Sequence, residues 1–269
     1  YSNIVSSIQA EEPEGVIEVL DPIVEKGIWS NVRITLVDSQ GNPFAGRRII
    51  FKIDRSDMSK WEIEQPVALT DSNGVAQGRI RGFEVATVRV TAEDRTIPMH
   101  FQIDGFDWLQ VRELPTMTLH TLPAYSKGLS RLITWNNIPG GYQYYIESSK
   151  NSNFSSPMNT GWISLNQFLF SNLEHAQGYF YRGKLRNSAQ VESAYSNVVS
   201  SIQDNEPPTI EEIDFEIISQ NQERRPKFTF LIKDLSRVSN VQFQCKLPEQ
   251  ETYVPCGSLS SLNDFHYVV

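Results

Sequence analysis

Residues 32–43 read VRITLVDSQGNP, and this stretch decides the fold class. Between Val32 and Leu36 every second residue is apolar, which gives an extended strand one buried face and one face in water. Asp38 and Gly41 follow the strand directly. Because Asp can cap the backbone of a turn and Gly can adopt a positive φ, this pair is typical of a hairpin turn. The stretch therefore predicts an antiparallel strand that ends in a tight turn.

The same pattern recurs along the chain. Apolar residues alternate with others over 88–92, 97–103 and 228–232, and turn sequences stand at 71–74 (DSNG) and 139–141 (PGG). No stretch shows the apolar period of a long amphipathic helix. Strand-length runs separated by such turns are typical of antiparallel sandwiches. We therefore predict an all-β chain of tandem antiparallel β-sandwiches.

Composition narrows the classes of function. The chain has 269 residues, of which 39% are hydrophobic, so two to three sandwiches of about 90–100 residues fit and each can bury a core. The net charge is -8 and the sequence pI is about 5.1, which disfavours binding to phosphate backbones. No apolar run approaches the ~18 residues of a membrane span. We expect neither a nucleic-acid partner nor membrane insertion of this segment.

The most specific signal is an internal repeat. Residues 1–9 read YSNIVSSIQ and residues 195–203 read YSNVVSSIQ, so they differ only at Ile4 and Val198. We expect residues 1–13 to be the terminal strand of a preceding module followed by a linker. The repeat also predicts that the chain belongs to a longer tandem array.

Joints between modules are marked by composition. Stretches rich in Glu and Pro at 11–15 and 204–208 predict short, fairly stiff linkers, because Pro restricts φ and cannot continue a strand ladder. A third joint is expected between Ile103 and Pro115. The predicted modules are 14–106, 107–205 and 206–269.

Residues 14–106 resemble the group 1 bacterial Ig-like domain of invasin- and intimin-type adhesins. The resemblance is carried by the order and spacing of four segments, at 32–46, 49–51, 70–76 and 86–92. It implies an Ig-like sandwich of a secreted bacterial surface protein.

Residues 107–205 resemble a fibronectin type III domain. Trp135 matches the family's core tryptophan, and Leu173 followed by Tyr179 matches its tyrosine corner, in which a buried Tyr bonds to nearby backbone. Gly183 departs from the family, which has a β-branched core residue there, and could mark a bulge or a tightly packed neighbour. Other matching positions are Tyr144, Ile146 and residues 193–199.

Residues 206–269 look like a further bacterial Ig-like domain, of the type that carries a Cys pair. The matching segments are 207–209, 226–230, 241–247, 253–256 and 262–269. The resemblance implies a disulfide between Cys245 and Cys256, which would stabilise the module by ~2–4 kcal/mol in an oxidising compartment. Two free buried thiols are the alternative. The module is expected to stop before its last strand.

The sequence offers no catalytic constellation. The four histidines lack metal-type spacing, and nucleophile-elbow, phosphate-loop and dinucleotide motifs are absent. Acidic pairs such as Glu62 and Glu64 are expected in a chain with 32 acidic residues, and they indicate solvated surface. The turn residues Asp38 and Asp71 could instead help hold calcium, although no dense acidic loop supplies the roughly six to eight oxygens required. We predict no enzyme activity, no cofactor and no metal site.

Aromatic residues outside the core pattern are the candidate contact residues. Trp162, Tyr145 and Tyr142 could form an outer face that stacks against sugar rings or a protein partner. Trp108 lies at the expected joint and is predicted to help fix the angle between domains. The alternative for all of them is packing at junctions or edge strands.

The resemblances imply a non-catalytic structural and adhesive segment of a large modular protein that is secreted or displayed on a cell surface. Stacked sandwiches arranged as a rod would project a binding tip or make contacts themselves. The expected partners are a cell-surface protein or glycan and further modules of the same chain. The alternative is a set of accessory or carbohydrate-binding modules of a secreted polysaccharide-degrading enzyme.

Overall fold

The computed structural model describes most of the chain. The described residues are 14–96, 100–220, 223–236, 241–242, 244–245, 251–255, 260–261 and 266–268. Every element in them is a β-strand, which confirms the all-β class. Within these residues no helix is long and apolar enough to span a membrane. The chain divides into two compact units, and the first joins the residues up to Met117 with Ile138–Tyr144 and Lys184–Tyr195.

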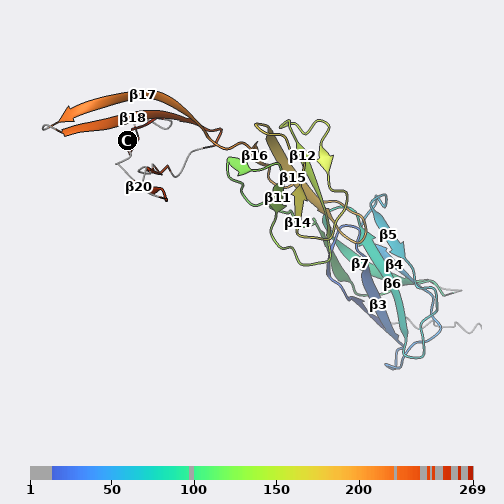
Figure 1. Ribbon diagram of the computed structural model, residues 1–269. Helices are drawn as coiled ribbons and strands as arrows, with labels where there is room; N and C mark the ends of the chain where they lie inside the picture. Colours follow the sequence, from blue (N-terminus) through green and yellow to red (C-terminus); the bar gives the residue numbers. More distant parts are fainter. Residues whose placement is uncertain are drawn as a thin grey trace, which may run out of the picture. The chain divides into compact units, whose positions relative to one another are not determined.

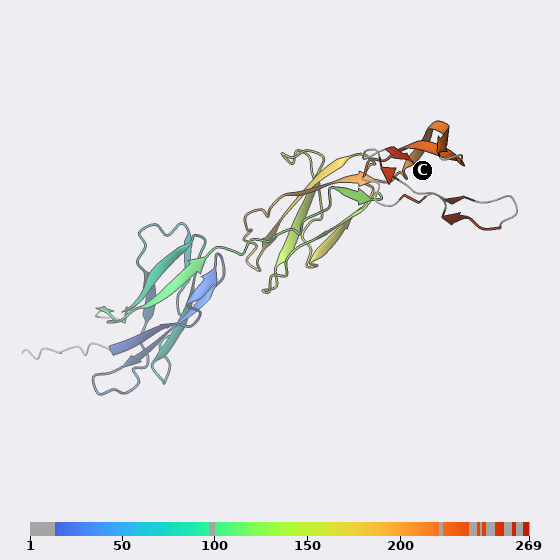
Figure 2. The same cartoon turned by 90° about the vertical axis from the view of Figure 1, so that its left-hand side faces the viewer.

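The first sandwich is built from two sheets (Figures 1 and 2). One sheet has the order β1–β3–β6–β5, and the other β2–β9–β7–β4, with β8 paired to β7. All pairs are antiparallel except β2 with β9. The strands are β1 (Glu14–Val19), β2 (Ile23–Glu25), β3 (Ser30–Val37), β4 (Ile49–Ile53), β5 (Trp61–Glu64), β6 (Val75–Gly82), β7 (Ala86–Asp94), β8 (Phe101–Gln102) and β9 (Asp107–Arg112).

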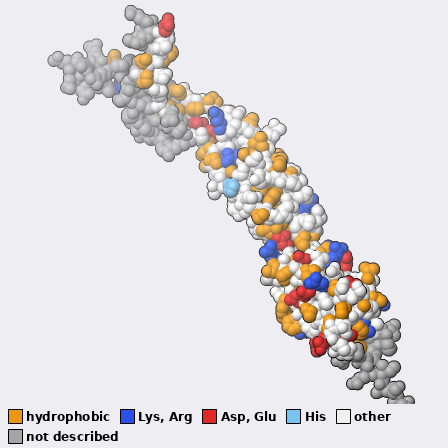
Figure 3. Space-filling view, turned by 90° about the horizontal axis from the view of Figure 1, so that it is seen from below, with side chains coloured by type: hydrophobic (Ala, Val, Ile, Leu, Met, Phe, Trp, Pro, Cys, Tyr) orange, Lys and Arg blue, Asp and Glu red, His pale blue; other side chains and the backbone are white. Residues whose placement is uncertain are grey.

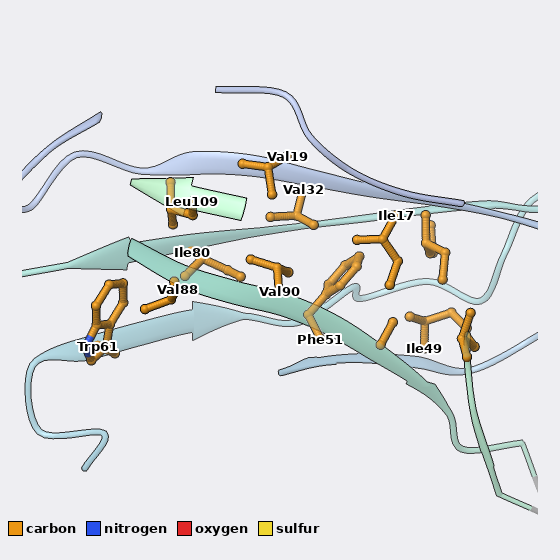
Figure 4. Packing of buried hydrophobic residues seen from close by; sticks show 14 of the residues in the cluster. Ile17, Val19, Val32, Ile49, Phe51, Trp61, Ile80, Val88, Val90 and Leu109 are labelled. Carbon is orange, nitrogen blue, oxygen red and sulfur yellow. The ribbon is translucent and has the colours of Figure 1, made fainter. Parts of the chain in front are cut away.

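The core of this sandwich follows the alternation seen in the sequence. The inward residues of β3 and β7 are fully buried, and Figure 4 shows several of them meeting between the two sheets. They are Val32, Ile34, Leu36, Val88, Val90 and Ala92. Trp61 is 4% exposed, and its indole N–H donates to Glu84 Oε1 at 2.9 Å. The buried ring therefore keeps a partner for its polar atom.

The two Asp-x-x-Gly turns form as predicted. Asp38 Oδ1 accepts hydrogen bonds from the backbone N–H groups two and four residues later, at 2.9 and 2.8 Å, and Asp71 Oδ1 does the same at 2.9 Å in both cases. Gly41 and Gly74 have φ of +81° and +74°. The backbone N–H donors lower the pKa of Asp38. Both carboxylates therefore act as turn caps, which favours that role over the calcium alternative.

The first sandwich continues beyond its predicted end. Strand β9, which the sequence analysis assigned to the second module, pairs with both β7 and β2. Its inward residues Leu109 and Val111 are fully buried. The alternation over 107–112 is therefore that of a core strand, and the sandwich includes Arg112.

The second sandwich has a five-stranded sheet, β10–β16–β15–β12–β13, and a two-stranded sheet, β11–β14. Trp135 is 3% exposed and Tyr179 is 2% exposed, as predicted for the core tryptophan and the tyrosine corner. The Tyr179 hydroxyl accepts a hydrogen bond from the Glu174 backbone N–H at 3.1 Å. The strands are β10 (Tyr125–Lys127), β11 (Arg131–Thr134), β12 (Gln143–Ser149), β13 (Met158–Asn159), β14 (Gln167–Phe170), β15 (Gly178–Arg186) and β16 (Val199–Asp204).

Side chains replace part of the strand ladder just before β16. The Gly183 N–H donates to Ser196 Oγ at 2.9 Å, while the Ser196 N–H donates to Gly183 O at 2.7 Å. Asn197 bonds both backbone groups of Leu119. The start of the segment that carries the repeat is therefore held in part by its own polar side chains, Ser196 and Asn197, before the β16 ladder begins.

The last part of the chain contains a long hairpin of β17 (Thr209–Gln220) and β18 (Glu223–Lys233), drawn in orange in Figure 1. The shorter strands are β19 (Gln244–Cys245), β20 (Val254–Pro255), β21 (Ser260–Ser261) and β22 (His266–Val268). Cys256 and the side chain of Cys245 lie outside the described residues, so the disulfide stays a prediction. The same holds for residues 1–13 and for the completeness of the last module.

Candidate interaction surfaces

One contact set joins two parts of the chain that are far apart in sequence. Ile138–Tyr144 and Lys184–Tyr195 carry the ends of β12 and β15 and belong to the same compact unit as the first sandwich. The Tyr142 hydroxyl donates to Glu25 Oε1 at 2.5 Å, and Asn187 Nδ2 donates to Lys26 O at 3.0 Å. We call these residues the junction.

The junction is partly shielded from water. Tyr142 is 9% exposed, and the side chain of Glu25 is 11% exposed, with an Arg112 nitrogen 3.8 Å away. Burial, together with the neighbouring Glu25 carboxylate, raises the pKa of Tyr142 above its ordinary value. The phenol therefore keeps its proton at neutral pH and serves as a permanent donor to the carboxylate.

A glycine allows the close approach at the junction. Gly27 has φ of +79°, and a Cβ there would lie 2.7 Å from Val191 Cγ2 and 3.1 Å from Ala189 Cβ. Its N–H donates to Gly82 O at 2.8 Å. Beside this contact is a hollow of about 480 Å³ whose lining includes Glu25 and Tyr142. A larger residue at position 27 would clash and would also strain the backbone.

Trp29, which the core pattern did not explain, lies in a cation–π ladder. The guanidinium groups of Arg79 and Arg81 lie 4.6 and 4.4 Å from its ring centre. Arg79 also forms a two-pronged ion pair with Glu64, at 2.7 and 2.9 Å, and this hydrogen bonding lowers the pKa of Glu64. Arg81 pairs with Glu62 at 2.6 Å. The acidic pair noted in the sequence is thus tied to basic partners on the neighbouring strand, and Figure 3 shows such interspersed charges on one face.

The structure corrects the expected position of Tyr142. The sequence analysis placed it on an outer face with Tyr145 and Trp162, but its ring is buried and its hydroxyl is bound to Glu25. Tyr142 and Glu25 are 117 positions apart in sequence, and Asn187 and Lys26 are 161 apart, so no local pattern could reveal these contacts.

Tyr145 and Trp162 do come together. Their ring centres are 5.3 Å apart, the rings are tilted by 46°, and both residues are half-buried. Tyr145 lies on β12, and Trp162 lies in the connection between β13 and β14. We call this pair the aromatic pair. Its predicted role in ligand contact stays a prediction.

Trp108 lies on β9 with 48% of its surface exposed. Its ring packs edge-on against Phe106, with ring centres 5.7 Å apart. The residue is therefore part of the first sandwich rather than of a linker. Its predicted influence on the angle between domains stays a prediction.

Residues able to bind a metal are not gathered in one place. Among the described residues, no three His, Cys, Asp or Glu side chains form a group that could hold a metal ion.

Comparison with known proteins gives neighbours at the level of the fold. No family model and no curated protein matches the chain. Among solved structures, the Yersinia pseudotuberculosis adhesin InvE is 15% identical, with 70% of this chain and 58% of that chain covered and a TM-score of 0.32. The Escherichia coli adhesin FdeC is 10% identical, with 96% and 88% covered and a TM-score of 0.35. A Fn3-like protein from Clostridium thermocellum is 18% identical, with 35% and 94% covered and a TM-score of 0.27. The chain thus spans little more than half of InvE, and its structural neighbours include adhesins and Fn3-like domains.

Proposed function

We propose that this chain is a non-catalytic structural and adhesive segment of a larger, modular, secreted or cell-surface protein. In such a segment firm packing within a compact unit presents a contact surface at a defined position. The junction is the observation that carries this proposal. A charged hydrogen bond from Tyr142 to Glu25 and a close approach at Gly27 support firm coupling of the first sandwich to the ends of β12 and β15.

The coupling predicts a measurable effect of the double variant Tyr142→Phe/Asn187→Ala. Tyr142→Phe removes the donor from a mostly buried carboxylate, and Asn187→Ala removes the donor to Lys26 O. Unpaired buried groups of this kind typically cost about 1–3 kcal/mol each. We expect residual dipolar couplings of the 138–144 and 184–195 amides to fit the alignment tensor of β3 and β6 in the native chain, and to depart from it in the double variant.

A matched control is Tyr144→Phe. Tyr144 is also buried, but its hydroxyl donates to Ile138 O at 3.3 Å and makes neither of the two hydrogen bonds to Glu25 and Lys26. This control should keep the native alignment. If the residual dipolar couplings of the native chain already needed one alignment tensor for β3 and β6 and another for residues 138–144 and 184–195, the proposal of a firm junction would be contradicted.

A second candidate function is glycan binding at the aromatic pair. Two half-exposed rings in contact provide a surface on which a sugar ring can stack. In many interfaces a small number of aromatic side chains supplies most of the free energy of binding. This role would suit either an adhesin or an accessory module of a secreted polysaccharide-degrading enzyme.

The aromatic pair is tested by Trp162→Ala and Tyr145→Ala. If it binds sugar, either variant should lower the affinity for the recognised polysaccharide by about tenfold or more. The assay is binding of the labelled chain to intact cells and purified polysaccharides at several salt concentrations, with circular dichroism to show that the variants remain folded. Trp108→Ala, which removes a half-exposed ring of the first sandwich, is the control. Equal binding by all variants would eliminate this second function.

A further inference from the structure

The core of the second sandwich contains polar side chains where apolar ones are usual. Ser148 on β12 and Ser201 and Gln203 on β16 are at most 2% exposed. Tyr181 on β15 is fully buried as well. Because side chains alternate between the faces of a strand, these residues point to the same inner face as the apolar core.

These residues form one cluster with Arg131. Arg131 Nη1 donates to Ser126 Oγ at 2.8 Å, and Ser126 is the register partner of Gln203 across β10 and β16. A hydrogen bond with the Ser148 side chain and the charge of Arg131 both lower the pKa of the Tyr181 hydroxyl. Burial dominates and raises that pKa to about 12, so the hydroxyl keeps its proton.

Much of the hydrogen-bonding capacity of the cluster is unused within the described part of the protein. The buried atoms with no protein partner there include Arg131 Nε, Ser201 Oγ, Gln203 Oε1 and Gln203 Nε2, whereas the Tyr181 hydroxyl has the Ser148 hydroxyl beside it. Each buried polar atom left unpaired lowers the folding equilibrium constant by roughly tenfold or more. Several such atoms together would cancel much of the free energy of unfolding of a domain of this size.

The mixture of donors and acceptors selects the ligand. Arg131 Nε can only donate, Gln203 Oε1 can only accept, and the hydroxyl groups can do both. A bound anion would not satisfy Gln203 Oε1, and a bound cation would not satisfy Arg131 Nε. Water satisfies both, and internal water typically makes two to four such bonds.

Water also has a route to the cluster. Ser126 lines an open hollow of about 560 Å³ together with Tyr125, Lys127 and Asp204. Its hydroxyl is the acceptor for Arg131, so the cluster and the hollow share one residue. We propose that the second sandwich contains a built-in site for internal water, held by Arg131, Tyr181 and Gln203 and reached past Ser126.

The repeat supports the site independently of the proposed function. Ser7 and Gln9 occupy the same repeat positions as Ser201 and Gln203. The two repeated segments thus keep the same two polar residue types.

The direct test is a water-selective nuclear Overhauser experiment on the labelled full chain. We expect cross-peaks of the sign of long-lived bound water at the Arg131 Nε–H and the Gln203 side-chain amide. Cross-peaks absent from both groups would overturn the proposal.

A second test uses two neighbouring tyrosines of β15. If no water reached the Tyr181 hydroxyl, Tyr181→Phe would remove a buried hydroxyl whose hydrogen bonds are incomplete, so the variant would be more stable and amide exchange across β15 would slow by roughly tenfold or more. With water bound, we expect exchange to be unchanged or faster. Tyr179→Phe is the control, because Tyr179 loses a known partner, the Glu174 N–H, and exchange should become faster. Slower exchange in Tyr181→Phe would overturn the water site.

Discussion

Gly74→Ala is expected to destabilise the first sandwich by roughly 2–4 kcal/mol, which is among the largest effects of a single added methyl group. Gly74 has φ of +74°, which strains any residue with a Cβ. The Cβ would also lie 2.2 Å from Leu36 O and 3.0 Å from Phe44 N. These neighbours are backbone atoms, so they cannot move away as a flexible side chain could. The effect should appear in urea unfolding followed by amide exchange in β3 and β6.

The control for this substitution is Gly41→Ala. Gly41 occupies the same position in the other Asp-x-x-Gly turn with nearly the same φ, +81°, but nothing lies within 4 Å of its Cβ position. The cost there should be that of backbone strain alone, about 1–2 kcal/mol. Equal losses of stability in Gly74→Ala and Gly41→Ala would mean that the backbone around Gly74 shifts to relieve the clash at no cost in free energy.

These turns show why much of the fold could be predicted. Asp38 and Gly41 act on backbone groups within four residues, so the sequence contains all that the turn needs. The alternation of β3 is equally local, since Val32 and Leu36 are buried by the pleat of their own strand. The core tryptophan and the tyrosine corner of the second sandwich were identified through a family resemblance.

The junction could not be predicted for the opposite reason. Glu25 and Tyr142 are 117 residues apart in sequence, and each looks like an ordinary surface residue in sequence. Strand β9 was assigned to the second module because its partners β7 and β2 are both separated from it in sequence, so no tight hairpin turn links it to either of them. The buried polar cluster is likewise hidden, since Ser201 and Gln203 read as outward residues by composition.

Asn197→Ala is expected to destabilise the second sandwich by about 2–3 kcal/mol. Asn197 Oδ1 accepts a hydrogen bond from the Leu119 N–H at 2.8 Å, and its Nδ2 donates to Leu119 O at 3.1 Å. Leu119 is 1% exposed, so water cannot readily replace these two bonds. Unpaired buried backbone groups typically cost about 1–3 kcal/mol each. Urea unfolding with amide exchange read in β15 and β16 measures the loss.

The neighbouring residue supplies the control and links the prediction to the repeat. Val198 is 51% exposed and is the one position at which residues 195–203 differ from residues 1–9, so Val198→Ala should change stability by less than about 0.5 kcal/mol. A large loss in Asn197→Ala beside a small one in Val198→Ala would mean that the repeat keeps the residues that hold this strand and varies the exposed one. A small loss of stability in Asn197→Ala would mean that the hydrogen bonds of Asn197 do not explain why residues 1–9 and 195–203 are nearly identical.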